Sequence, residues 1–318
     1  MINTIEAAST ECLGACPLCG GTSWRTLPAP GRWIGSEVFG DLQGKLGLVR
    51  CRSCGLVFTN PRPSSGRLSA FYSGDTYSCH EATGSASAGA KADFVLKRIA
   101  NYLPPEAPRT LLDYGAGGGG FLSHARNNGW KVRGFEPGKR GLESCRQAEL
   151  DVTDKLENLS PAEFGLVTLH HVFEHLANPT EVLDGVRHFL AREGRLYIEV
   201  PNVRSMRARL AIPFLSRRFQ IDERYRAYPI HLVYYSDRTL REMLGKVGWT
   251  VEATFTIGLG LDEFFIRRET SHKQTTRPGK SNSVLPPPKR RLRHKLRDAF
   301  LTLGIGENLA AIAYPNQS

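Results

Sequence analysis

The sequence predicts an α/β protein, a doubly wound parallel sheet with a small cysteine-rich module in front of it. From residue 91 onward, strand-like apolar segments alternate with helix-like segments, which is the pattern of such a sheet. The first of these strands runs into a glycine-rich turn at residues 113–120, where a ligand can approach bare backbone. Two Cys-x-x-Cys pairs before residue 60 indicate the separate module. The 318 residues suffice for one large domain with appendages.

The paired cysteines, Cys16, Cys19, Cys51 and Cys54, are typical of a structural zinc site. Four thiolates suit tetrahedral zinc, and the glycine after each pair permits a tight turn. A redox dithiol needs only one pair, in a thioredoxin-like context that the sequence lacks. We therefore predict that residues 1–60 form a zinc-binding module. It serves either as a folding staple or as a lid or docking surface.

Residues 61–90 are predicted to form a connector without regular structure, because proline and small residues are frequent there. Tyr72 and Tyr77 lie in this connector. Two interpretations of these tyrosines stay open: they anchor a loop, or they face the active site.

The main domain is expected at residues 91–265. A helix begins at Lys91 and stops before the proline pair at 104–105, since apolar residues repeat there at helical spacing. A capped helix is expected after Ser236. The helices alternate with strands, which are expected at residues 109–114, 131–136, 150–153, 164–169, 195–200 and 249–257.

Three further segments accompany this domain. A basic amphipathic stretch at residues 204–218 is expected to be a helix over the carboxyl edge of the sheet. Residues 266–303 are predicted to be a basic linker followed by an amphipathic helix. Residues 304–318 are predicted to hold the last strand of the sheet.

Most of the net charge of +11 lies in one late segment. Residues 267–297 contain eleven Lys or Arg and one acid, so this segment carries +10 and the rest of the chain +1. The simplest interpretation of this segment is a solvated linker and a surface helix. An anionic lipid surface is the alternative, with nucleic acid as the less favoured partner. No apolar run approaches the roughly 20 residues of a membrane span, and no secretory signal is visible. We expect a cytoplasmic protein, with peripheral contact to the inner face of the membrane as an open alternative.

Three features are expected to meet at the carboxyl edge of the sheet, where ligands bind in such folds. They are the glycine loop after Asp113, the acid Glu136 at the end of the second strand, and the run His-His-Val-Phe-Glu-His at residues 170–175. Glu136 lies 17 residues beyond Gly119, close to the offset of about 20 residues for an acid that binds ribose hydroxyls. Together they indicate a nucleotide cofactor site.

This arrangement resembles the class I S-adenosylmethionine (SAM)-dependent methyltransferases. The first motif of that family is an acid followed by Gly-x-Gly-x-Gly, which Asp113, Gly115, Gly117 and Gly119 match, and its ribose-binding acid matches Glu136. The resemblance implies a Rossmann-like methyltransferase sheet beside a zinc-ribbon-like module, with SAM and zinc as cofactors.

One branch of the family is matched in more detail. Residues 171–176 resemble its Val-Leu-Glu-His-Leu segment, and residues 194–202 resemble its Gly-x-Leu-x-x-x-x-Pro-Asn strand. Residues 231–236 resemble its histidine-containing segment before the late helix. Gly165 departs from the family, which usually has an aspartate in the fourth-strand motif.

The resemblance also implies roles for individual residues. The implied cofactor-binding residues are Asp113, Gly115, Gly117, Gly119, Phe121, Glu136, Pro137 and His170. The candidate bases for the proton of the acceptor are His171, Glu174, His175 and His231. Glu174 and His175 have a second interpretation, in which they orient the cofactor or cap the following helix.

The cysteine module and the tyrosine-containing connector are similar to those of sugar C-methyltransferases and related enzymes of bacterial glycan and natural-product pathways. We therefore predict methyl transfer from SAM to a small molecule or a sugar or glycan intermediate. Two alternatives stay open. One is an RNA or DNA methyltransferase, which steep salt dependence of binding would reveal. The other is an inactive zinc-ribbon protein that binds or senses the cofactor, an alternative that rests on Gly165 and on the unidentified base and that the intact glycine loop and Glu136 oppose. Neither the oligomeric state nor the acceptor atom is predicted.

Overall fold

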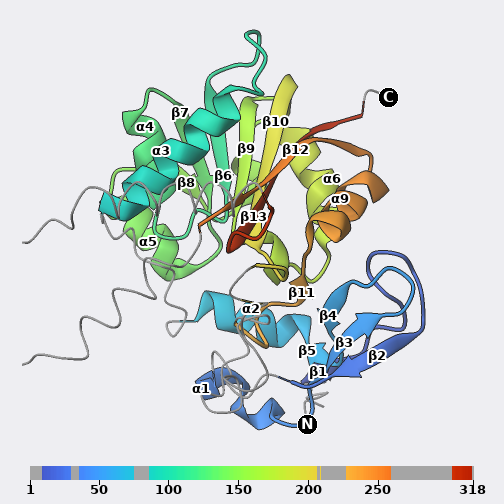
Figure 1. Ribbon diagram of the computed structural model, residues 1–318. Coiled ribbons are helices and arrows are strands. Elements are labelled where there is room, and N and C mark those ends of the chain that lie inside the picture. Colours follow the sequence, from blue (N-terminus) through green and yellow to red (C-terminus); the bar gives the residue numbers. More distant parts are fainter. Residues whose placement is uncertain are drawn as a thin grey trace, which may run out of the picture.

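The main body of the protein is a seven-stranded sheet with helices on both faces (Figure 1). The structure is a computed structural model, and it describes residues 9–29, 36–74, 86–205, 208, 227–258 and 303–316. The strand order is β12-β13-β10-β9-β6-β7-β8. Strand β13 runs antiparallel to both of its neighbours, whereas the pairs from β10 to β8 are all parallel. The predicted α/β fold with a doubly wound sheet is confirmed.

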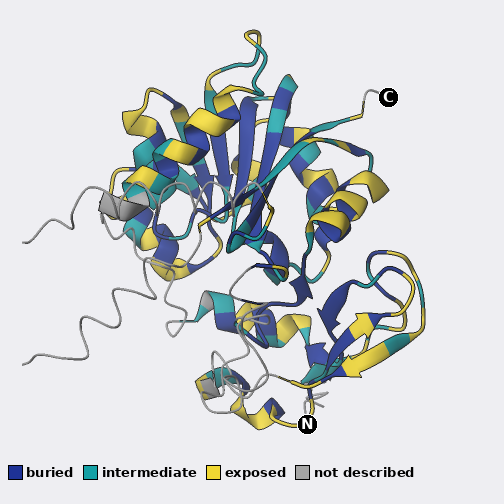
Figure 2. Ribbon diagram, viewed as in Figure 1, coloured by how far each residue is buried: buried dark blue, intermediate teal, exposed yellow. Residues whose placement is uncertain are grey.

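The strands form where apolar residues are nearly continuous, because both faces of this sheet are covered. In β6, Leu111 belongs to the core on one face and Leu112 to the core on the other, and both are fully buried. Figure 2 shows the same burial along the inner strands. The strands are β6 (Thr110–Tyr114), β7 (Lys131–Phe135), β8 (Val152–Thr153), β9 (Phe164–His170), β10 (Leu190–Pro201), β12 (Trp249–Ile257) and β13 (Asn308–Pro315).

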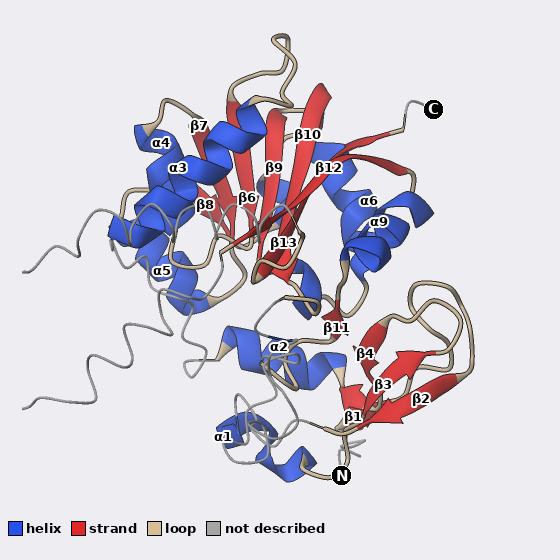
Figure 3. Cartoon of the chain, viewed as in Figure 1, coloured by secondary structure: helices blue, strands red, loops and turns tan. Residues whose placement is uncertain are grey.

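Helices α3 (Ala86–Ala100), α4 (Gly120–Asn127) and α5 (Lys139–Gln147) cover one face of the sheet, and α6 (Pro179–Phe189) and α9 (Asp237–Lys246) cover the other (Figure 3). A short turn of 3-10 helix, η2 (Leu156–Asn158), precedes β9. None of the described helices has the length and hydrophobicity of a bilayer-spanning segment.

The predicted cap of α9 is confirmed. The side chain of Ser236 accepts a hydrogen bond from the N–H of Thr239, and Thr239 Oγ1 accepts one from the N–H of Ser236 at 2.9 Å. This reciprocal capping box satisfies two backbone donors that a helix start would otherwise leave without partners.

The second part of the protein, which we call the cysteine module, comprises the described residues 9–29 and 36–74. Its antiparallel sheet has the order β11-β4-β3-β2, where β2 is Trp24–Leu27, β3 is Leu48–Cys51, β4 is Val57–Thr59 and β11 is Val233–Tyr234. The fourth strand therefore comes from a segment far later in the sequence. Smaller elements complete the module: β1 (Thr10–Glu11) paired with β5 (Arg62–Pro63), α1 (Ser36–Phe39), η1 (Gly40–Leu42) and α2 (Ser65–Ser73).

One apolar core runs from the cysteine module into a face of the large sheet. Phe58 of β4 and Leu169 of β9 belong to the same cluster of buried residues, together with Phe173 and Tyr235. The rings of Phe173 and Tyr235 stack with their centroids 5.1 Å apart. The module is thus packed against the carboxyl edge of the sheet, below the strands in Figure 1.

The prediction that residues 61–90 lack regular structure is wrong where the structure describes them. Helix α2 forms because Leu68 and Phe71 are buried in the core of the module. Helix α3 begins at Ala86, five residues before the predicted start, in a run of alanine and small residues that tolerates helix. Strand β10 likewise begins at Leu190 rather than 195, because it pairs with Phe164 of β9 before a register shift.

Several predictions lie outside the described residues. They are the helix at residues 204–218 except its first two residues and residue 208, the basic linker and amphipathic helix at 266–303 except its last residue, and the position of Tyr77.

Candidate active site

The glycine loop joins β6 to α4 through left-handed backbone. The φ angle is +82° at Gly115, +55° at Gly117 and +79° at Gly119, values that residues with a side chain rarely adopt. The N–H of Gly115 donates to the carbonyl of Phe135 at 2.7 Å, which fastens the loop to β7. A Cβ atom at Gly115 would lie 2.5 Å from Cγ2 of Val172. The loop therefore requires glycine and packs directly against the histidine-containing segment 170–175.

Glu136 follows β7 and lies beside this loop. Its Oε2 accepts a hydrogen bond from the N–H of Gly117 and its Oε1 accepts one from the N–H of Gly138, both at 2.7 Å. Burial raises the pKa of Glu136, and these two N–H groups oppose that shift. The carboxylate is held in one orientation, and each of its oxygens can accept a further hydrogen bond. This geometry suits the predicted binding of ribose hydroxyls, with the exposed Pro137 next in the chain.

Asp113 lies beneath the loop. It is 2% exposed, and its Oδ1 accepts a hydrogen bond from Oγ1 of Thr168 at 2.7 Å. Burial raises the pKa of Asp113, against the effects of His170 and Thr168. The contact with Thr168 connects β6 to β9 directly under the loop. Asp113 therefore supports the loop from below, and its predicted contact with the cofactor stays a prediction.

Phe121 and His170 lie together at the carboxyl edge of the sheet. Their rings are in contact, with centroids 4.1 Å apart. Phe121 is in the first turn of α4, directly after the glycine loop, and His170 is the last residue of β9. The structure therefore brings both predicted residues to the loop, and their role in cofactor binding stays a prediction.

The departure at Gly165 has a packing reason. A Cβ atom at this position would lie 1.9 Å from the carbonyl oxygen of Pro108, so an aspartate does not fit. The N–H of Gly165 also donates to Oγ1 of Thr110 at 3.1 Å. Gly165 lies at the start of β9, about 16 Å along the strand from His170 at about 3.3 Å per residue. Gly165 therefore does not indicate a loss of function at the carboxyl edge.

The chain leaves β9 in a sharp turn at His171. The φ angle of His171 is +53°, and its N–H donates to the carbonyl of Glu199 on β10 at 2.9 Å. A 3-10 turn, η3 (Phe173–His175), follows at once. The turn buries the Glu174 side chain, which is 1% exposed.

Glu199 is the centre of a buried ionic network that the sequence analysis missed. Burial would raise its pKa, but its basic neighbours outweigh burial and hold that pKa well below the usual range. The partners of the carboxylate are Lys91 Nζ at 2.7 Å, Asn308 Nδ2 at 2.7 Å, Tyr197 OH at 3.0 Å, His171 Nε2 at 3.3 Å and His170 Nδ1 at 3.5 Å. A signal was present in the sequence, because Glu199 interrupts an apolar strand at its carboxyl end.

His171 lies between two buried carboxylates. Its Nε2 is 3.3 Å from Glu199 Oε1, and its Nδ1 is 3.5 Å from Glu174 Oε1. Burial would lower the pKa of His171, but the two carboxylates outweigh burial and raise it to about 9. The imidazole is therefore charged at neutral pH and has no free lone pair. Of the candidate bases, His171 is the least suited to accept a proton.

The free energy of unfolding is expected to fall as pH rises toward 9, because of His171. Its folded pKa of about 9 lies above the ordinary value of 6.5, so its stabilising effect is complete below pH 6.5 and is lost as pH rises through 9. Urea unfolding at several pH values from 6 to 9.5 should show this slope in the natural protein. His171→Gln should lose most of the slope, and His188→Gln, an exposed site on α6, should keep it. An equal slope in all three proteins would contradict this assignment.

The remaining three candidates form a compact cluster. Nε2 of His231 lies 3.8 Å from Oε1 of Glu174, and the rings of His175 and His231 meet edge to face with centroids 4.6 Å apart. Both carboxylate oxygens of Glu174 are buried, and within the described residues neither has a hydrogen-bond partner. Burial would raise the pKa of Glu174, but the surrounding histidines outweigh it and lower that pKa. The structure thus brings His231 to Glu174 and His175 from more than fifty residues away.

His175 is oriented by two contacts of its Nδ1 atom. This atom lies 3.0 Å from the carbonyl oxygen of Ile230 and 2.8 Å from the hydroxyl of Tyr72. A carbonyl oxygen only accepts, so Nδ1 carries the proton and Nε2 keeps the lone pair. Burial lowers the pKa of His175, although Glu174 and the Ile230 carbonyl oppose the shift. The structure therefore places Tyr72 beside this candidate base, and both interpretations of the tyrosine stay open.

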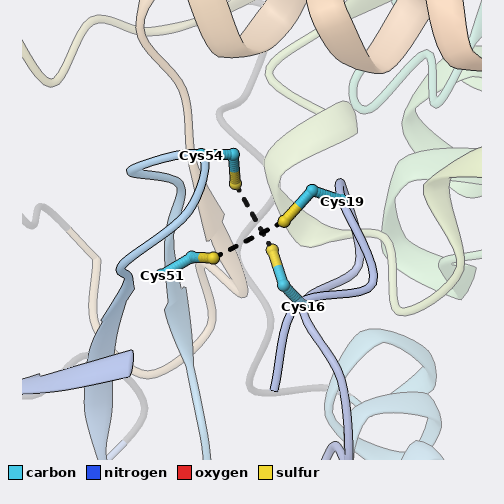
Figure 4. A group of neighbouring side chains, drawn as sticks. All are labelled: Cys16, Cys19, Cys51 and Cys54. Atoms are coloured by element: carbon cyan, nitrogen blue, oxygen red, sulfur yellow. Dashed lines mark hydrogen bonds between the residues drawn. The ribbon is translucent and has the colours of Figure 1, made fainter. Parts of the chain in front are cut away.

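The four paired cysteines converge on one point (Figure 4). Sγ of Cys16 lies 3.6 Å from Sγ of Cys54, and Sγ of Cys19 lies 3.6 Å from Sγ of Cys51. These separations are far longer than a disulfide bond of about 2.05 Å. Burial would raise the pKa of Cys51, but the N–H groups of Cys54 and Ser53 and its cysteine neighbours outweigh burial and lower that pKa to about 6.

Residues 89–254, just over half of the chain, match a family described as the methyltransferase domain. The chain belongs to this family. It is a SAM-dependent methyltransferase, and the predicted activity and cofactor are confirmed at this level. The sequence matches none of the curated proteins with which it was compared.

Several solved structures are similar to this methyltransferase. One is a SAM-dependent methyltransferase from Archaeoglobus fulgidus, with 19% identity, 70% of this chain and 93% of that chain covered, and a TM-score of 0.44. A second, from Mesorhizobium loti, has 14% identity and a TM-score of 0.44; the match covers 71% of this chain and 99% of that chain. A third, from Thermotoga maritima, has 17% identity and a TM-score of 0.42; the match covers 71% of this chain and 91% of that chain.

Proposed function

We propose that this methyltransferase transfers the methyl group of SAM to a small molecule or to a sugar or glycan intermediate. The observation that carries the proposal is the cluster of buried Glu174 and His231 with half-buried His175. Glu174 and His175 come shortly after Val172, whose side chain packs against Gly115 of the glycine loop. A buried imidazole next to the methyl donor suits an acceptor that must lose a proton, such as a hydroxyl or an acidic C–H group.

SAM supplies a methyl group that its sulfonium already activates, so the protein has to position the acceptor and take its proton. His175 is the best-suited base. Its pKa is lowered by burial, so its imidazole is neutral at pH 7, and the Ile230 carbonyl holds the proton on Nδ1. Nε2 then accepts the proton of the acceptor, and the imidazolium that forms is stabilised by the carboxylate of Glu174. Glu174 is thus a positioning residue in this proposal.

His231 is the second base candidate. It faces the same carboxylate from the opposite segment, with its Nε2 3.8 Å from Oε1 of Glu174. In our proposal His231 orients the acceptor, because its ring lies against the base His175. The Tyr72 hydroxyl, next to Nδ1 of His175, keeps that ring in place.

We also propose that the cysteine module holds one zinc ion. At a Zn–S distance of about 2.3 Å, tetrahedral geometry requires sulfur atoms about 3.8 Å apart, and the measured separations of 3.6 Å agree with it. Cys16, Cys19, Cys51 and Cys54 would be the ligands, and the ion would join the two loops that carry them.

The cluster of Glu174, His175 and His231 is less suited to a second metal ion. Two ligand atoms at about 2.1 Å from one ion lie about 3.0–3.4 Å apart, whereas His231 Nε2 and Glu174 Oε1 are 3.8 Å apart. The Nδ1 atom of His175 is also engaged by Ile230 and Tyr72. This comparison supports an acid–base role for the cluster.

The proposed function is tested by methyl transfer from radiolabelled SAM to a panel of acceptors. The panel holds nucleotide-linked sugars, small hydroxylated compounds, and bulk tRNA and duplex DNA as the competing class. We expect label in at least one non-polymeric acceptor, with one S-adenosylhomocysteine formed per methyl group. Label only in nucleic acid, or SAM binding without transfer to any acceptor, would contradict the proposal.

A further inference from the structure

The segment that carries His231 belongs to the sheet of the cysteine module. Strand β11 pairs with β4 in the register Val233 to Phe58 and Tyr234 to Val57. An antiparallel pair fixes the backbone on both sides of each residue pair. The pairing with β4 therefore helps to set the position of His231, which lies two residues before β11.

Thr59, the last residue of β4, makes the direct connection. It is fully buried; its N–H donates to the carbonyl of Leu232 at 2.9 Å, and its Oγ1 donates to the carbonyl of His231 at 3.1 Å. The N–H of Leu232 in turn donates to the carbonyl of Glu174 at 2.8 Å. The His231–Leu232 peptide is thus bound by the cysteine module on one side and by the Glu174 turn on the other.

The cysteines lie at the other end of the same hairpin. Cys51 ends β3, and Cys54 lies in the turn that leads into β4, where the N–H of Cys51 donates to the carbonyl of Leu56 at 2.9 Å. Thr59 is only five residues after Cys54, about 17 Å of extended chain at about 3.3 Å per residue. A metal held by the four cysteines would fix this turn, and with it the strand that holds His231.

The module has a second connection to the same site. Tyr72 of α2 contacts Nδ1 of His175 at 2.8 Å. By contrast, the glycine loop and Glu136 make the hydrogen bonds described above with residues of the large sheet and its connections. The module also approaches the cofactor half, since a Cβ atom at Gly138 would lie 3.2 Å from the carbonyl oxygen of Tyr72. None of the hydrogen bonds given above for the glycine loop and Glu136 comes from the module, however.

We infer that the cysteine module is part of the acceptor side of the active site: its metal and Thr59 position His231, and leave SAM binding unaffected. This inference rests on the proposed function for the role of His231. It makes Thr59 a positioning residue, and it gives the zinc ion a place in the reaction beyond holding the module together.

The test uses the full chain, first with its metal content measured and then with Thr59→Val, which removes only the hydroxyl. The matched control is Thr26→Val on β2, at the exposed opposite edge of the same sheet. Three properties are compared: amide hydrogen exchange in peptides covering 228–235, the imidazole NMR signals of His231, and the dissociation constant for SAM. Turnover is added once an acceptor is known.

For Thr59→Val we expect exchange in 228–235 to be at least about tenfold faster and the His231 signals to shift, with SAM affinity within twofold. Thr59→Ser should restore both, because serine provides the same hydroxyl. Thr26→Val should match the natural protein. Removing zinc with a chelator should have the same effect on 228–235 as Thr59→Val, reversed by adding zinc back.

Three results would overturn the inference. One is an unchanged exchange rate and unchanged His231 signals in Thr59→Val. Another is loss of SAM binding together with the faster exchange, because the module would then support the whole fold. The third is a natural protein with no bound metal. None of these readouts needs an acceptor, so a failure of the proposed function is recognised separately, as SAM binding without methyl transfer.

Discussion

Gly115→Ala is expected to weaken SAM binding by about 100-fold. A residue with a side chain at φ of +82° costs about 1–2 kcal/mol. The new Cβ atom would also lie 2.5 Å from Cγ2 of Val172, so the loop or the 170–175 segment has to move. Together these effects correspond to about 2–3 kcal/mol, or roughly 30–150-fold in affinity. Isothermal titration calorimetry with SAM measures the change.

Gly185→Ala is the matched control. Gly185 is an exposed residue of α6, and a Cβ atom there meets nothing within 4 Å. Alanine is favoured over glycine inside a helix by about 0.5–1 kcal/mol, so this variant should be slightly more stable and bind SAM as the natural protein does. Equal SAM affinity in Gly115→Ala and Gly185→Ala would show that the loop does not approach the cofactor.

His175→Gln is expected to reduce kcat by about 100- to 10,000-fold, the range for loss of a general base. SAM affinity should change little, because the proposed role of His175 is toward the acceptor. In the natural protein kcat should fall as the pH is lowered through the pKa of His175. That pKa lies below 6.5 because of burial, so the decline is expected below pH 6.5.

The control for this variant is His188→Gln, which changes an exposed histidine of α6 in the same way. It should keep the full rate and the same pH profile. If His175→Gln kept the rate while His231→Gln lost it, the base would be His231 and His175 would be its positioning partner. If both kept the rate, neither imidazole would be the base.

The loop geometry of the proposed cofactor half could be predicted from local sequence. The glycines of the loop and Glu136 are close in the sequence, and their predicted roles rest on backbone geometry that only glycine allows and on an acid at a strand end. Most strand boundaries could also be predicted to within a few residues, because nearly continuous apolar runs identify buried strands.

For the proposed acceptor half, the sequence indicates candidate residues but not the contacts between them. His231 and Glu174 were both proposed, but their contact is made by tertiary packing across 57 residues of sequence. Lys91 and Asn308 were missed because nothing in the local sequence marks them. Their side chains reach Glu199 only in the folded protein, Lys91 from α3 and Asn308 from β13. Such packing also raises the pKa of His171, which makes this histidine less suited to accept a proton than the other candidates; its predicted role stays a prediction.

Gly165 shows the limit of comparing a sequence with a motif. The motif indicated a missing aspartate, whereas the structure shows that the carbonyl of Pro108 occupies the space of any side chain there. A departure from a motif can thus be caused by a neighbouring residue that leaves no room for the usual side chain, and it does not by itself indicate a lost activity.

The pairing of β11 with β4 also has a consequence for the synthesis of the chain. Phe58 is made 175 residues before its partner Val233, which at 5–20 residues per second is about 9–35 seconds of translation. For that time β4 has an open edge, which is the kind of strand that pairs with other chains. A ribosome-bound chain with its cysteines already assembled still lacks the strand that closes its first sheet, so the period of greatest aggregation risk ends only when the His231 segment has left the ribosome.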